Sequence, residues 1–286
     1  MKTLKYFFQF IIIITFFLIF KLIGKKFAVI ISDCLIKFLG PLFRSKKIIE
    51  KNLLRAIPNL TRKEIETITS NMWGNYGKIL AEYVFIKNFR KSNLKDKIHI
   101  DGQEILENIK RDKEPVIFIS GHFNNFELMA MHIERSGIEL AAIYRPLNNK
   151  FLNFVMEKIR KKYICQNQIK KGISGMKQLL LFFKKKTSIA LMIDQRVSEG
   201  IKSDFFKQKA YTTTIPAQFV KKFNCKVVPI YIERKKDLSF QLTIYNPIKY
   251  TNEDSIDSIT LQLNSILEKM ILKNPDQWIW SHNRWK

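Results

Sequence analysis

The chain has 286 residues, of which 46% are hydrophobic and 26% are charged. A chain of this size and balance can bury a substantial core, which excludes disulfide-stapled miniproteins, short binding peptides and wholesale disorder. Fifty Lys and Arg residues against twenty-five Asp and Glu residues give a formal net charge of +25, which favours acidic partners such as nucleic acid, anionic lipid, a phosphorylated substrate or an acidic carrier protein; compositional drift toward lysine is the alternative source of this excess.

The first predicted element is an apolar helix over residues 4–23, interrupted mainly by Gln9 and Thr15. Its length just reaches the roughly 20 residues needed to cross the hydrocarbon core of a bilayer. No small-residue cleavage site follows it, so residues 1–26 are expected to be a retained transmembrane anchor and not a cleaved signal peptide.

Residues 27–43 are also apolar but carry Asp33 and Lys37. This pattern favours an interfacial or docking helix over a second crossing, and packing into the core is the alternative. More Lys and Arg residues follow the anchor than precede it, so the rest of the chain is expected on the cytoplasmic side of the membrane. The same basic cluster favours contact with an anionic membrane surface. No linker or repeat divides residues 44–286, which we interpret as one domain.

In that domain a helix with an N-cap at Thr61 is predicted over residues 61–85. Short apolar β-branched runs then alternate with segments of helical periodicity. The expected strands are residues 116–120, 140–144, 189–193, 227–233 and 240–245, and the expected helices are residues 126–136, 151–163, 174–185, 216–223 and 256–273. This alternation predicts an α/β fold with a mixed, largely parallel sheet flanked by helices.

Ligands of such sheets bind at the carboxyl ends of the strands. The first of these ends carries the segment GHFNNFE, with His122 and Glu127. Positions five apart on a helix diverge by roughly 140°, so His122 is expected in the turn and Glu127 in the next helix, with Asn124 or Asn125 as its cap. Glu127 would then accept the Nδ1 proton while Nε2 takes a proton from a substrate hydroxyl. The alternative is that His122 makes only ordinary hydrogen bonds at a helix start.

Five sequence blocks, in order and at fitting distances, carry a family resemblance: GHFNNFE, YRPLNN, LMIDQR, FF with AYTTTIPA, and NPDQWIWSHNRWK. Together they resemble the bacterial lipid A biosynthesis lauroyl/myristoyl acyltransferases, from the anchor to the last residue. The resemblance implies a single-pass inner-membrane enzyme of the lysophospholipid-acyltransferase-like superfamily, with its catalytic domain in the cytoplasm. Such enzymes move a fatty acyl chain from an acyl carrier protein thioester to the hydroxyl of a 3-hydroxyacyl chain on a Kdo-bearing lipid A precursor, without a metal or another cofactor.

The resemblance also implies roles for single residues. His122 would be the general base and Glu127 its orienting partner. Arg145 would bind phosphate or stabilise the developing oxyanion, which suits its permanent charge, and Asp194 would support the site. The alternative is an interior ion pair between Arg145 and Asp194.

A threonine run at the start of a predicted helix would offer hydroxyls and backbone N–H groups to an anion, or would simply cap that helix; its members are Thr212, Thr213 and Thr214. Two residues depart from the family's usual glycines, Lys207 and Ile215. The basic residues Lys202, Lys207 and Lys209 are expected to add phosphate contacts.

The remaining candidates favour structural roles. His132 lies within the predicted helix over residues 126–136, and His99 lies in the strand-like segment IHIDG. His282 lies in an aromatic C-terminal segment that we interpret as packed or membrane-facing. The three cysteines form no CxxC pair, so the sequence suggests neither a disulfide framework nor a metal site.

Acyl transfer to another membrane glycolipid or aminolipid is an alternative function. A membrane-anchored polyanion-binding protein is a remote one, and no nucleic acid is expected because no nucleic-acid-binding motif is present.

Overall fold

The computed structural model describes residues 2–91 and 97–286. Its main sheet has seven strands in the order β1-β9-β8-β2-β5-β3-β4, and a separate hairpin pairs β6 with β7. Neighbours in the main sheet are parallel except β8 and β9, so the expected mixed, largely parallel sheet is confirmed. The strands are β1 (Ile98–Asp101), β2 (Ile117–Ser120), β3 (Leu140–Tyr144), β4 (Asn167–Lys170), β5 (Ser188–Met192), β6 (Ile201–Phe205), β7 (Gln208–Thr212), β8 (Val227–Arg234) and β9 (Phe240–Ile244).

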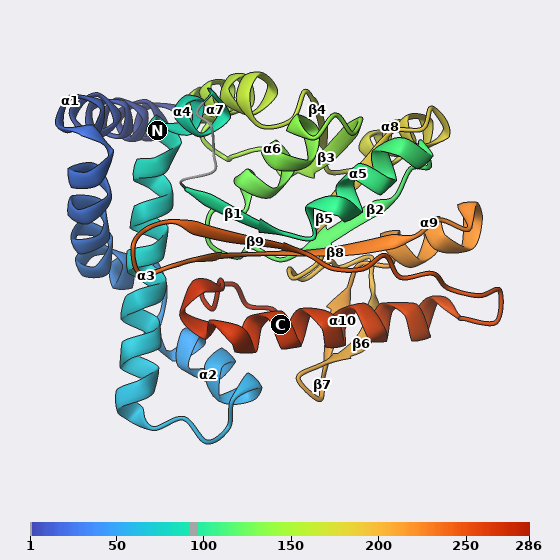
Figure 1. Ribbon diagram of the computed structural model, residues 1–286. Coiled ribbons are helices and arrows are strands. Elements are labelled where there is room, and N and C mark those ends of the chain that lie inside the picture. The colour runs from blue at the N-terminus through green and yellow to red at the C-terminus, as the bar shows by residue number, and fades with distance from the viewer. Residues whose placement is uncertain (1, 92–96) are drawn as a thin grey trace.

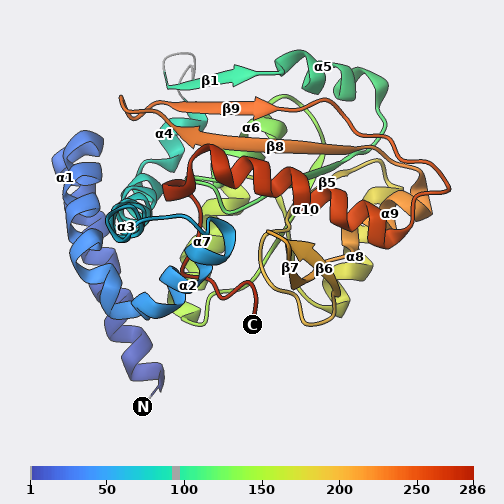
Figure 2. The same ribbon diagram turned by 90° about the horizontal axis from the view of Figure 1, so that it is seen from below.

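Helices cover both faces of this sheet: α10 runs beneath it in Figure 1, and α5 and α6 lie above it. Viewed from below, α10 crosses in front of the strands (Figure 2). The helices are α1 (Lys2–Phe43), α2 (Lys46–Ala56), α3 (Arg62–Val84), α4 (Ile86–Lys91), α5 (Gln103–Asp112), α6 (Glu127–Arg135), α7 (Lys150–Tyr163), α8 (Ile173–Lys184), α9 (Ile215–Phe223), α10 (Ile256–Lys273) and the short 3-10 helix η2 (Pro275–Gln277).

The predicted elements match this arrangement closely. The expected strands and helices recur with ends within one or two residues, and α10 and β3 match fully. At α3 the Thr61 side chain accepts from the Glu64 backbone N–H, and the Glu64 carboxylate accepts from the Thr61 N–H, a capping box that explains where this helix begins. Several short elements, among them α2, α5, β4 and the β6–β7 hairpin, were not among the predicted elements.

The core lies between the sheet and its helices. All four residues of β2 are buried, as expected for a central parallel strand covered on both faces. The aromatic C-terminal segment also packs inward, since Trp278 is 2% exposed and Trp280 is fully buried. Of the two interpretations of that segment, packing is therefore confirmed.

Helix α1 combines the expected anchor and the expected docking helix in one element. It bends at Gly24, whose φ of 80° is left-handed and is readily adopted only by glycine. We call residues 2–23 the outer half and residues 25–43 the inner half. By length and composition α1 is able to cross a membrane.

The inner half runs side by side with α3 (Figure 1). Ser32 donates a hydrogen bond to the Gly77 carbonyl at 2.7 Å, and a Cβ at Gly77 would lie only 2.1 Å from the Ser32 carbonyl oxygen. Asp33 pairs with Lys78 at 2.8 Å and with Lys37 at 2.9 Å. This close approach of two helices requires glycine, so the inner half is docked on α3.

Candidate active site

The first predicted junction is a turn between β2 and α6. His122 lies in this turn and Glu127 is the first residue of α6, as the spacing predicts. Asn124 has a left-handed φ of 44°, which asparagine tolerates better than most residues. The expected capping role of Asn124 or Asn125 is wrong, because α6 begins without a side-chain cap and both amides bond elsewhere.

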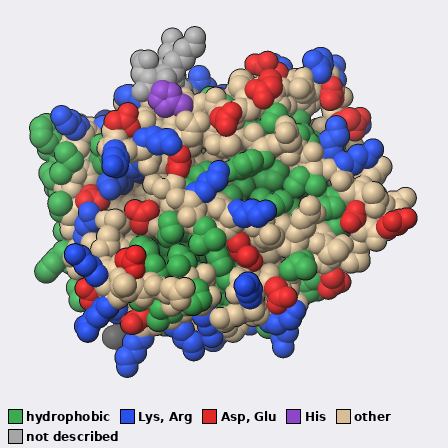
Figure 3. All heavy atoms as spheres, turned by 60° about the horizontal axis from the view of Figure 1, so that its bottom comes forward, with side chains coloured by type: hydrophobic (Ala, Val, Ile, Leu, Met, Phe, Trp, Pro, Cys, Tyr) green, Lys and Arg blue, Asp and Glu red, His purple; other side chains and the backbone are tan. Residues whose placement is uncertain are grey.

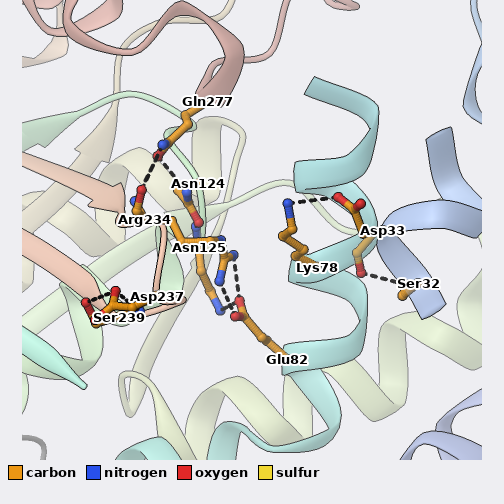
Figure 4. A network of polar contacts seen from close by, with 11 residues as sticks. Ser32, Asp33, Lys78, Glu82, Asn124, Asn125, Arg234, Asp237, Ser239 and Gln277 are labelled. Atoms are coloured by element: carbon orange, nitrogen blue, oxygen red, sulfur yellow. Dashed lines mark hydrogen bonds and ion pairs between the residues drawn. The ribbon is translucent and has the colours of Figure 1, made fainter. Parts of the chain in front are cut away.

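Those amides bond to two distant side chains, Glu82 and Gln277, and both of these contact Arg234 (Figure 4). Asn125 donates to Glu82 of α3 at 2.9 Å, and Glu82 also pairs with Arg234 at the end of β8. Asn124 donates to the side chain of Gln277 at 2.7 Å, and that oxygen also accepts from the Arg234 backbone N–H at 2.8 Å. The His122 turn is therefore fixed by buried hydrogen bonds, as a preorganised site requires.

The imidazole of His122 is oriented by Asp194 at the end of β5. The Nδ1 atom lies 2.7 Å from Asp194 Oδ1, and the His122 backbone N–H donates to Oδ2 at 2.7 Å. The indole N–H of Trp278 donates to the same Oδ2 at 2.9 Å. Sequence reasoning expected Glu127 at Nδ1, and among the described residues Nδ1 instead has Asp194 as its hydrogen-bond partner. The physical reason is that β2 and β5 are neighbouring parallel strands, whose ends meet at one sheet edge.

Glu127 has other partners. Arg160 of α7 contacts Glu127 Oε1 through Nη2 at 2.6 Å and through Nε at 2.7 Å, and the hydroxyl of Tyr83 donates to the same oxygen. Sequence reasoning did not identify Tyr83 or Arg160, because both come from helices with no motif that links them to the His122 turn. The Glu127 carboxylate is thus an anchor between α6 and α7.

The charges of this site perturb one another. Burial alone would lower the pKa of His122, but the charge and hydrogen bond of Asp194 outweigh it, so the pKa is raised. Burial alone would raise the pKa of Asp194, but the charge and hydrogen bonds of His122 hold it below its usual range. Burial and the Glu127 charge raise the pKa of the Tyr83 hydroxyl well above its ordinary value. His122 and Asp194 therefore form an ion pair when the imidazole is protonated.

A cavity of about 370 Å³ opens beside the His122 ring, a size typical of small-ligand sites. Its walls are mostly aliphatic; among them are Ala130, Ala142, Ile143, Ile164, Met176, Leu179, Ala190, Leu191, Met192, Val197 and Ile215. Charged side chains also line it, namely Glu127, Arg145, Arg160, Lys170 and Lys171. Among the described residues that line it there is no Ser or Cys, so this lining offers His122 neither of the usual seryl or cysteinyl nucleophiles. The cavity suits an apolar chain attached to an anionic group.

Some of the other predicted residues line the cavity, and the others have partners outside it. Arg145 is exposed and lines the cavity, and Thr213 lines it as well. The alternative ion pair between Arg145 and Asp194 is wrong, because Asp194 is fully buried and is bonded to His122 and Trp278. Thr212 accepts from Arg284 at 2.6 Å, and Thr214 accepts from Gln218 at 2.9 Å.

The basic hairpin residues lie elsewhere. Lys207 is exposed at the turn of the β6–β7 hairpin, and Lys209 pairs with Asp204 at 3.1 Å. Neither Lys207 nor Lys209 lines the cavity beside His122. Of the expected anion contacts, the geometry therefore brings only Arg145 and Thr213 to the site.

Two of the remaining histidines, His132 and His282, have structural partners. Buried His132 contacts Gln103 at 2.9 Å, and burial lowers its pKa to about 4. His282 accepts from the Arg196 backbone N–H at 3.1 Å, which fastens the C-terminal segment to the loop after Asp194. No cluster of metal-binding side chains occurs in residues 2–91 and 97–286.

Comparison with known proteins decides the family. The family model described as bacterial lipid A biosynthesis acyltransferase matches residues 1–286. The chain belongs to this family. The lauroyl/myristoyl acyltransferase resemblance noted in the sequence is thereby confirmed.

Three similar members of the lipid A biosynthesis acyltransferases come from two organisms. The lipid A biosynthesis acyltransferase of Haemophilus influenzae is 25% identical over 85% of this chain and 78% of its own length. The Escherichia coli lauroyltransferase is 23% identical over 85% of this chain and 79% of its own. The Escherichia coli myristoyltransferase is 23% identical over 80% of this chain and 71% of its own length. Membership in this family makes the chain an acyl-transferring enzyme of lipid A biosynthesis, with a lipid A precursor as substrate.

Proposed function

We propose that this acyltransferase moves a fatty acyl chain from an acyl carrier protein thioester to the hydroxyl of a 3-hydroxyacyl chain on a Kdo-bearing lipid A precursor. The observation that carries the proposal is the His122 ring. Its Nδ1 is held by Asp194, and its other side borders a mostly apolar cavity with a basic rim. Nε2, which the Gln195 side-chain amide approaches to 3.5 Å, then acts as the base toward a hydroxyl held in that cavity.

In the proposed reaction the acceptor hydroxyl gives its proton to His122 Nε2 while its oxygen attacks the thioester carbonyl carbon. Asp194 stabilises the imidazolium that forms. Arg145, whose guanidinium is permanently charged, stabilises the anionic oxygen or holds a phosphate of the acceptor. The new C–O bond remains, the C–S bond breaks, and the carrier thiol leaves with the proton returned by His122.

This proposal revises the role of two carboxylates. Asp194 takes the orienting role that sequence reasoning gave to Glu127. Glu127 becomes a positioning residue, because its partners are Arg160 and Tyr83. No metal or organic cofactor takes part, and the acyl carrier protein thioester is the donor substrate.

We further propose that α1 attaches the enzyme to the cytoplasmic face of the bacterial inner membrane. The net charge of +25 suits three anionic partners, namely the acyl carrier protein, the phosphorylated acceptor and the membrane surface. The expected phosphate contacts of Lys207 and Lys209 remain part of the proposal as contacts at the β6–β7 hairpin, outside the cavity.

The decisive experiment supplies purified enzyme with acyl carrier protein thioesters and a Kdo-lipid A precursor, and measures product masses. A mass increase by one acyl group is expected. A His122→Ala variant should lose at least about 10²-fold in transfer rate. Unchanged turnover in a folded variant would contradict the base assignment, and transfer only to another glycolipid or an aminolipid would contradict the acceptor.

A further inference from the structure

The outer half of α1 contacts the body of the enzyme near both of its ends. Its less exposed side chains recur every three or four residues, the spacing of one helix face. These residues, which we call the inward stripe, are Tyr6, Phe10, Ile13, Phe17 and Phe20. Phe20 is only 1% exposed and packs with Ala81 and Phe85. This partial cover at helical spacing indicates that one face of the outer half is turned toward the enzyme.

The N-terminal end of the inward stripe contacts the start of α7. The Asn149 amide donates to the Tyr6 carbonyl oxygen at 2.8 Å. The ring of Phe151 lies 5.7 Å from that of Phe7 and 5.8 Å from that of Phe10. The outer half therefore contacts the catalytic domain near both of its ends, at α7 and around Phe20.

A transmembrane path would break these contacts. Tyr6 and Ile23 are about 25 Å apart along a helix axis, nearly the thickness of the hydrocarbon core. If this segment crossed the bilayer, Tyr6 would lie near the opposite surface. Helix α7 is unable to follow it, because it carries four lysines, and lysine in the hydrocarbon core is costly; they are Lys150, Lys158, Lys161 and Lys162.

The opposite face of the outer half is strongly apolar and open. Its exposed side chains include Phe8, Ile12, Phe16, Ile19 and Leu22. In Figure 3 hydrophobic side chains crowd the left edge of the molecule, where α1 lies. An exposed apolar face of this extent needs an apolar partner.

The same kind of surface continues onto α7 and the loop before it. Phe154 is 59% exposed and Leu147 is 41% exposed, and Lys158 lies over the Phe154 ring at 4.2 Å. Apolar side chains beside lysines are typical of an element at the boundary between headgroups and acyl chains. We call the exposed face of the outer half, together with Leu147, Phe151 and Phe154, the lipid-facing surface.

We propose that the outer half of α1 lies along the cytoplasmic leaflet of an anionic bilayer and does not cross it. The lipid-facing surface is embedded in that leaflet, and the inward stripe stays on the enzyme. Lys2 and Lys5 then remain on the cytoplasmic side, as the distribution of basic residues in membrane proteins favours. This inference rests on the proposed membrane location, and it replaces the single pass expected from hydropathy and length.

The arrangement has a consequence for substrate entry. Arg145 lines the cavity, and Leu147 and Asn149 belong to the same loop, which leads into α7. The Leu147 backbone N–H donates to Asn153 of α7 at 2.8 Å. The mouth of the cavity is thus built on elements of the lipid-facing surface, so an acylated acceptor reaches His122 from the leaflet.

Cross-linking in native membranes tests this path. In a Cys34→Ser background, thiols introduced by Phe10→Cys and Phe151→Cys should be joined by a short bis-maleimide. The matched control combines Leu22→Cys with Phe151→Cys, because Leu22 lies about 18 Å from Phe10 along the helix. A helix along the leaflet gives a cross-link only in the first pair. Its absence there, or its appearance only in the control pair, overturns the inference.

A second measurement does not depend on those variants. Thr3→Cys in the same background is treated with a membrane-impermeant maleimide. Labelling is expected only after spheroplasts are permeabilised, and labelling of intact spheroplasts overturns the inference. Recovery of the wild-type chain in the soluble fraction would overturn the membrane location and this inference together, whereas a membrane-bound chain labelled from outside overturns this inference alone.

Discussion

The Nδ1 atom of His122 lies 2.7 Å from Oδ1 of Asp194, a residue 72 positions further along the chain. The pair joins the ends of two neighbouring strands, β2 and β5. Trp278 holds the second carboxylate oxygen, so both oxygens are occupied and the imidazole has one preferred orientation. Asp194 therefore controls the basicity of His122, because its carboxylate raises the pKa of the imidazole.

Replacing Asp194 by Asn should shift the acid limb of the pH–rate profile to lower pH. The Asp194 carboxylate raises the pKa of His122, so its removal lets the imidazole stay neutral at lower pH. The plateau rate should fall by about 10²-fold or more, because the imidazolium is less stabilised. Initial rates between pH 5 and 9 (roughly the range in which a histidine titrates) provide the measurement. An unshifted acid limb would contradict the assignment.

The same pair should make stability depend on pH. The folded-state pKa of His122 is raised, so its contribution is fully present below the unfolded-state value of about 6.5 and is lost as pH rises through the folded value. The difference in unfolding free energy between wild type and His122→Gln should therefore shrink as pH increases across that interval. Denaturant titrations at several pH values measure it, and a difference that grows with pH would count against the ion pair.

Replacing Glu82 by Gln should destabilise the fold by about 3–5 kcal/mol, because it leaves the buried Arg234 guanidinium without its counter-charge. The Glu82 side chain is fully buried and that of Arg234 is 5% exposed. The matched control is Glu114→Gln, which breaks an exposed pair with Lys186 and should cost at most about 1 kcal/mol. Chemical denaturation in detergent compares the two variants, and equal effects would contradict the proposed difference.

Arg145→Ala should weaken use of the phosphorylated acceptor. Loss of a charged hydrogen bond costs about 1.5–3 kcal/mol, equivalent to roughly 10–100-fold in kcat/KM. Arg145→Lys keeps the charge and should recover part of this loss, although lysine does not reproduce the bidentate geometry. Steady-state kinetics with varied acceptor separates the two variants. An unaltered kcat/KM in both would remove Arg145 from the site.

Filling the cavity should select against long acyl chains. Ala142 and Ala190 are register partners on β3 and β5, and both line the cavity. Ala190→Leu adds a branched side chain there, so transfer of longer chains should fall more than transfer of shorter ones. Ala190→Gly leaves the space open and should keep the wild-type order of chain lengths. Competition between thioesters of different length, with products resolved by mass, measures the preference.

Local patterns in the sequence were sufficient for much of the fold. The helical spacing of residues 256–273 and the Thr61 cap predict α10 and the start of α3 because both signals lie within a few residues of one another. The alternation of strands and helices predicts the largely parallel sheet for the same reason. The position of His122 in a turn, ahead of Glu127, also follows from helix geometry alone.

Sequence by itself therefore determined the elements, the family resemblance and the histidine at the strand end. Only the tertiary structure decided that Asp194 binds Nδ1 of His122, that Arg160 and Tyr83 bind Glu127, and that the outer half of α1 contacts the start of α7. Each of these contacts joins residues far apart in the chain, and their pairing depends on strand order and helix packing. The spacing of residues within one segment does not indicate which distant side chain will contact it in the folded protein.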